Sequence, residues 1–139
     1  MKQVRVTRDI AARPDEIWPV LTDARRLAAL DTGITRIDGR IASGETFTLT
    51  ADVSGSRSFR ITVAEITAPS RMVWKSGNAV FRGERVFTLT PTASGTRFEM
   101  VETFTGLMLP LIWRSMPDLT PSFEQFAAAI AAETERKAA

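Results

Sequence analysis

The stretch that decides the fold is DIAARPDEIWPVLTD, residues 9–23. It continues a strand-like segment, residues 3–10, in which polar and apolar residues alternate. Pro14 suits the first position of a helix, because a proline there loses no helical hydrogen bond. Asp15 and Glu16 follow in the first turn, where the helix dipole favours negative charge. The stretch therefore predicts a short helix that begins immediately after a strand.

A second short helix is expected over ARRLAAL, residues 24–30. Pro19 has no N–H to donate to the helical ladder, so the first helix is short or bent. Asp23 can cap the second helix, and Gly33 is expected to end it. Two short helices are thus predicted between the first strand and the rest of the chain.

The middle of the chain reads as β structure. Short segments rich in Gly, Ser, Asn and Pro separate six strand candidates at hairpin spacing. Short connections join antiparallel neighbours, so the pattern predicts a meander. The six candidates are residues 35–41, 45–53, 58–66, 71–76, 80–90 and 96–104.

Apolar residues recur at every second position of these strands, which predicts a sheet with one apolar face. Such a sheet needs a cover. The last helix is expected to supply it, with Thr120 as its cap, Pro121 in its first turn and an apolar stripe along one side. The apolar face comprises Phe47, Leu49, Ala51, Val53, Phe59, Ile61, Val63, Met72, Trp74, Phe81, Phe87, Leu89, Phe98, Met100 and Phe104, and the stripe comprises Phe123, Phe126, Ala127 and Ile130.

The composition narrows the functional classes. The 139 residues include no Cys, His or Tyr, so a disulfide and a Ser-His-Asp triad are excluded and no metal or cofactor is expected. The net charge is only +2, which does not favour nucleic acid as a partner. The most apolar run, residues 106–113, is shorter than the roughly 20 residues of a membrane span. The first residues lack an apolar signal core. We expect one cytoplasmic domain over residues 1–139.

These elements predict an α+β helix-grip fold. In it, a curved antiparallel sheet of about seven strands carries two short helices after the first strand and a long C-terminal helix across its concave face. The sequence resembles the SRPBCC superfamily, also called START-like or Bet v 1-like, which includes bacterial polyketide cyclase/dehydrase-like proteins. The similarity covers essentially the whole chain. It rests on IAARPDEIWPVLTD (10–23), GERVFTLTPTASGTRFEMVETFTG (83–106) and MPDLTPSFEQFAAAI (116–130).

The resemblance implies a ligand cavity between the sheet and the last helix. Members of the superfamily bind lipids, sterols, polyketides or plant hormones there, and some catalyse cyclisation or dehydration. This chain lacks the histidines and tyrosines that many catalytic members place in the cavity. We therefore favour a binder or carrier of a hydrophobic small molecule or lipid. A cyclase/dehydrase-type enzyme and a protein-interaction module remain the alternatives.

The candidate ligand-binding residues lie on the apolar face of the sheet, in the last helix and just before it. Ligand cavities are lined by such aromatic and aliphatic side chains, although each of them also suits an ordinary core. The candidates are Phe59, Trp74, Phe81, Arg85, Phe87, Met100, Glu102, Phe104, Met116, Phe123 and Phe126.

Arg85 and Glu102 interrupt this apolar pattern. If Ala93 and Ser94 form the hairpin tip, Arg85 faces Glu102 across two strands, whereas a bulge at Gly95 would change the register. Charges are seldom buried unless paired. The pair is either a polar handle for a carboxylate, phenolate or carbonyl of the ligand, or a half-solvated structural ion pair. No catalytic residue is assigned, but in an enzyme Glu102 would be the acid/base and Arg85 its oxyanion partner.

The run GLMLPLIW, residues 106–113, invites a separate interpretation. It is expected as a loop or short helix that Pro117 separates from the last helix. It could form a lid over the cavity, an apolar surface that touches a membrane during lipid transfer, or ordinary cover for the core.

Overall fold

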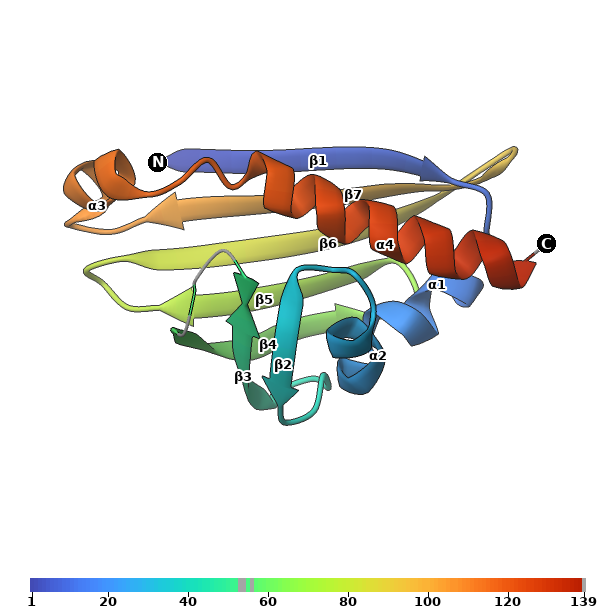
Figure 1. Ribbon diagram of the computed structural model, residues 1–139, viewed down its shortest axis with the longest axis horizontal. Coiled ribbons are helices and arrows are strands. Elements are labelled where there is room, and N and C mark those ends of the chain that lie inside the picture. Colours follow the sequence, from blue (N-terminus) through green and yellow to red (C-terminus); the bar gives the residue numbers. More distant parts are fainter. Residues whose placement is uncertain (53–54, 56, 139) are drawn as a thin grey trace.

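The computed structural model describes residues 1–52, 55 and 57–138. Its centre is a seven-stranded antiparallel sheet in the order β1-β7-β6-β5-β4-β3-β2, with the long helix α4 packed along it (Figure 1). The predicted α+β helix-grip arrangement is confirmed. The elements are β1 (Lys2–Ile10), α1 (Pro14–Leu21), α2 (Ala24–Ala29), β2 (Ile34–Asp38), β3 (Thr46–Ala51), β4 (Ser58–Thr67), β5 (Arg71–Gly77), β6 (Arg82–Thr92), β7 (Gly95–Thr105), α3 (Leu109–Ser115) and α4 (Thr120–Ala138).

The two short helices begin where the sequence predicts. Helix α1 starts at Pro14. The Glu16 carboxylate accepts a hydrogen bond from the backbone N–H of Arg13, the residue before the helix, at 2.9 Å. Asp23 caps α2 by accepting from the N–H groups of Arg25 and Arg26. The expected end at Gly33 is wrong, because α2 stops at Ala29 and the next residue is already extended.

Strands β2 and β3 end earlier than predicted. The strand expected over residues 35–41 ends at Asp38, since Gly39 turns the chain with φ +126°. A Cβ on Gly39 would lie 2.8 Å from Cβ of Phe47, so the turn also requires the small residue. The strand expected over 45–53 ends at Ala51, and its last predicted residue, 53, lies outside the described residues.

The strand expected over residues 80–90 begins later, at Arg82. The side-chain oxygen of Asn78 accepts hydrogen bonds from the N–H groups of Val80 and Phe81. This local bonding holds the preceding residues in a turn instead of the strand ladder.

The hairpin between β6 and β7 has the predicted register. Thr92 pairs with Gly95, which leaves residues 93 and 94 at the tip. Phe87 consequently faces Met100 on the inner side of the sheet. No register shift interrupts this ladder, and so the alternative with a bulge at Gly95 is not realised.

Helix α4 covers the apolar face. The ring of Phe126 lies 5.9 Å from that of Phe87 and 6.5 Å from that of Phe98, measured between centroids. The predicted cap, Thr120, is instead the first residue of the helix. The Asp118 carboxylate accepts a hydrogen bond from the Thr120 N–H. None of the described helices is both long and apolar enough to cross a membrane.

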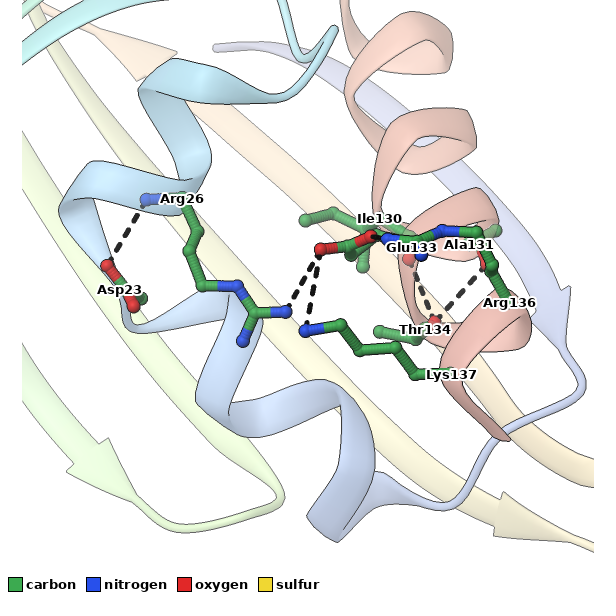
Figure 2. A network of polar contacts seen from close by, with 8 residues as sticks. All are labelled: Asp23, Arg26, Ile130, Ala131, Glu133, Thr134, Arg136 and Lys137. Atoms are coloured by element: carbon green, nitrogen blue, oxygen red, sulfur yellow. Dashed lines mark hydrogen bonds and ion pairs between the residues drawn. The ribbon is translucent and has the colours of Figure 1, made fainter. Parts of the chain in front are cut away.

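The C-terminal half of α4 is tied to α2 by one carboxylate. Figure 2 shows Arg26 extending from α2 to Glu133, with Nη2 and Oε2 3.0 Å apart. Arg136 also donates to Glu133, and Lys137 lies 3.7 Å from it. The hydrogen bonds from Arg26 and then Arg136 lower the pKa of Glu133. These contacts fix α4 at the end remote from α3.

Candidate ligand cavity

A cavity of about 1730 Å³ opens between the inner face of the sheet, the α3–α4 connection and the N-terminal half of α4. All the predicted ligand-binding residues line it except Phe87. Phe87 is fully buried between Trp74, at 4.7 Å, and Phe126, so it belongs to the packed core. The lining residues from the prediction are Phe59, Trp74, Phe81, Arg85, Met100, Glu102, Phe104, Met116, Phe123 and Phe126.

Sequence reasoning missed part of the lining. Leu49 and Ile61 line the cavity, and their period-two positions beside Phe47 and Phe59 carried that signal. Ile112 and Leu119 also line it, but they lie in α3 and the connection after it. Those segments have no periodic apolar pattern, so their sequence does not predict which side chains face the cavity.

Aromatic rings form the wall near α3. The rings of Phe81 and Phe104 stack with centroids 5.7 Å apart, and Trp113 of α3 lies 5.3 Å from Phe104. Phe59 sits at the rim and is 42% exposed. The wall is therefore apolar inside and reaches solvent at β4.

The predicted pairing of Arg85 with Glu102 is confirmed. The two residues are directly opposite across β6 and β7, and Arg85 Nε donates to Glu102 Oε1 at 2.7 Å. The guanidinium carbon lies 4.6 Å from the ring centroid of Phe123 on α4. The side chains keep 22% and 11% of their surface exposed, so this ion pair is mostly withdrawn from water.

Trp74 contributes packing to the cavity floor. It lies edge-on to Phe47, at 5.1 Å, and to Phe87. Its indole N–H is sealed from solvent without a hydrogen-bond partner.

Across the described part of the chain, no three His, Cys, Asp or Glu side chains gather in a group that would hold a metal ion.

A family model described as polyketide cyclase / dehydrase and lipid transport matches residues 1–137. The chain belongs to this family. The predicted resemblance to the SRPBCC superfamily is thereby confirmed. No functionally curated protein matches the sequence.

Solved structures share the fold of this polyketide cyclase / dehydrase and lipid transport family member at low identity. The protein MLL2253 from Mesorhizobium loti matches with a TM-score of 0.78 and 20% identity, over 97% of this chain and 98% of that one. A norcoclaurine synthase point mutant from Thalictrum flavum, in complex with a transition-state analogue, matches at 0.78 and 13%, over 99% and 96%. The di-domain ARO/CYC protein StfQ from the steffimycin biosynthetic pathway matches at 0.78 and 15%, over 98% of this chain and 52% of that one.

Proposed function

We propose that this protein binds and carries a hydrophobic small molecule or lipid in the cavity between the sheet and α4. The observation that supports this is an open hollow of about 1730 Å³ with aromatic side chains and the Arg85–Glu102 ion pair on its wall. Small-molecule sites combine apolar lining with a few placed polar groups. Arg85 and Glu102 are the polar groups that would orient the ligand.

The family favours the same function. Its description names both polyketide cyclases and lipid transport. The chain has no His, Cys or Tyr, which removes the commonest general base, the thiol nucleophile and the phenol acid. A carrier needs none of these groups, and we therefore favour carriage over catalysis.

Blocking the cavity tests the proposal. Ser122 of α4 is half-buried and lines the cavity, whereas Glu124 points outward and is exposed. We expect Ser122→Trp to place an indole ring inside the hollow and to weaken binding of the neutral dye Nile red by about tenfold or more. Glu124→Trp, which adds the same ring outside, should bind the dye as the wild type does. Fluorescence titration measures both. Equal affinities in the two variants would contradict a binding site in this cavity.

A second surface next to the cavity suits a membrane. Backbone hydrogen bonds join Leu107 to Ala79 and Met108 to Val80, at 3.0 and 2.9 Å, so the β5–β6 turn and the start of residues 106–113 form one patch. Leu107 is 82% exposed, Leu111 60% and Val80 46%. Leu109 is buried against the core instead. Residues 106–113 thus have one side that packs on the core and an opposite side that exposes apolar residues.

The charged residues within the two segments of this mouth patch are both basic, and the acidic Asp118 follows directly after them. Residues 77–82 and 105–117 contain two charged residues, Arg82 and Arg114, and no acidic one. Exposed apolar side chains beside arginines are typical of surfaces that bind anionic lipid. We infer that the mouth patch contacts an anionic membrane while the ligand enters or leaves.

Vesicle sedimentation tests the membrane contact. We expect the protein to sediment with phosphatidylcholine–phosphatidylglycerol vesicles and less with phosphatidylcholine alone. The double variant Leu107→Gln/Leu111→Gln and the variant Arg114→Gln should each lose most of this binding. Arg36→Gln removes an exposed arginine on β2 and serves as the matched control. Binding that is unchanged in the double variant would rule out the mouth patch.

A further inference from the structure

The Arg85–Glu102 ion pair on the cavity wall leaves hydrogen-bonding atoms of both side chains without a hydrogen-bond partner in the described part of the chain. Glu102 Oε1 accepts from Arg85 Nε, but in the described residues Glu102 Oε2 and the terminal nitrogens of Arg85 have no partner. These atoms are not sealed, because the sealed and unpartnered side-chain atoms of the described chain are Arg71 Nη1 and Trp74 Nε1. An acceptor and donors therefore lie side by side on the cavity wall.

Gly83 makes room for this arrangement. It neighbours the pair on the inner face of β6, opposite Ser76 of β5. A Cβ built on Gly83 would lie 2.4 Å from Glu102 Oε2 and 3.4 Å from the Ser76 hydroxyl oxygen. The carboxylate thus occupies the space of a missing side chain. Any larger residue at this position would displace it.

The charge of the pair decides which head group fits. Glu102 already neutralises Arg85, so a ligand carboxylate would meet a second carboxylate in a poorly hydrated site. It would also leave Glu102 Oε2 without a donor. A hydroxyl has one donor and two acceptor sites, and it can donate to Oε2 while it accepts from Arg85.

We propose that the cavity selects a ligand whose apolar body ends in an uncharged hydroxyl, phenolic or alcoholic, held between Glu102 Oε2 and the Arg85 guanidinium. This inference rests on the proposed function, since it concerns the same cavity. It narrows the ligand class by excluding carboxylic acids as the preferred head group.

Probes with one body and different heads test the inference at neutral pH. Naphthalene reports the apolar cavity alone, and calorimetric titration compares it with 2-naphthol, 2-methoxynaphthalene and 2-naphthoate. We expect 2-naphthol to bind about tenfold more tightly than 2-methoxynaphthalene, which cannot donate, and 2-naphthoate to bind most weakly.

Two variants should change this order of probe affinities, and a control variant should keep it. Glu102→Gln removes the like charge and frees Arg85, so 2-naphthoate should gain about tenfold or more and overtake 2-naphthol. Gly83→Ala should abolish the advantage of 2-naphthol by displacing the carboxylate. Glu65→Gln changes an exposed carboxylate of β4 that does not line the cavity and should keep the wild-type order.

The outcomes separate the two proposals. Equal binding of 2-naphthol and 2-methoxynaphthalene, or tightest wild-type binding of 2-naphthoate, would overturn the head-group inference while leaving the carrier function intact. Failure of all four probes to bind would overturn both. If Glu102→Gln does not fold, the Gly83→Ala result decides alone.

Discussion

Two phenylalanines that the sequence assigns to the same cavity have opposite surroundings. Phe126 of α4 is 2% exposed and contacts the rings of Phe87 and Phe98, whereas Phe59 of β4 stands at the cavity rim with 42% of its surface exposed. A buried ring stabilises the fold through the neighbours that pack closely around it, whereas a ring at the rim has fewer such contacts.

We therefore predict a large difference between two alanine variants. Phe126→Ala should lower the free energy of unfolding by about 3–5 kcal/mol, since it leaves a void between α4 and the sheet. Phe59→Ala, at the rim, should change it by about 0.5 kcal/mol. Urea denaturation measures both values. Similar losses in the two variants would contradict the described packing of α4.

The elements at the two ends of α4 are held differently. Near its C-terminus, Glu133 binds Arg26 of α2 together with Arg136 and Lys137 of its own helix (Figure 2). Near its N-terminus, Phe123 borders the cavity and the Arg85 guanidinium. The contacts of Glu133 with Arg26, Arg136 and Lys137, here called the clamp, thus fix the end of α4 that does not line the cavity.

The clamp predicts a dependence of stability on pH. The pKa of Glu133 is lowered in the folded state, first by its hydrogen bond from Arg26, so the unfolded state binds the proton more readily. The stabilisation is present above the unfolded pKa of about 4.5 and is lost as the pH falls through the lower folded pKa. Thermal unfolding at a series of acidic pH values should show a shallower decline for Glu133→Gln than for the wild type. The exposed control Glu84→Gln should follow the wild-type curve, and a wild-type curve from Glu133→Gln would refute the clamp.

At the scale of the whole molecule, the first and the last strand lie side by side at one edge of the sheet. Strand β1 pairs with β7 over its entire length, from Lys2 opposite Phe104 to Ile10 opposite Thr96. Val4 and Val6 of β1 enter the core beneath α4. The cavity is lined by residues of β2 to β7, of α3 and α4, and of the connections between them. No single segment carries the candidate site, so the proposed ligand binding requires the complete fold.

The sequence alone determined the features that depend on neighbouring residues. Pro14, Asp15 and Glu16 specify the start of α1, because helix termini are satisfied by residues within one turn. The turn at Ala93 and Ser94 specifies the register that places Arg85 opposite Glu102, since a short hairpin leaves few alternative pairings. Period-two alternation specified the inner face of the sheet and the part of the cavity lining that this face contributes.

The tertiary structure decided what depends on distant segments. Phe87 and Phe59 have the same local pattern, but α4 seals the first and leaves the second at the rim. The partner of Arg26 is more than a hundred residues away, and the outward side of residues 106–113 appears only when α3 packs on Phe104. Local patterns fix which face is apolar. Which part of that face is filled, and which stays open as a cavity, is set by how closely remote elements approach it.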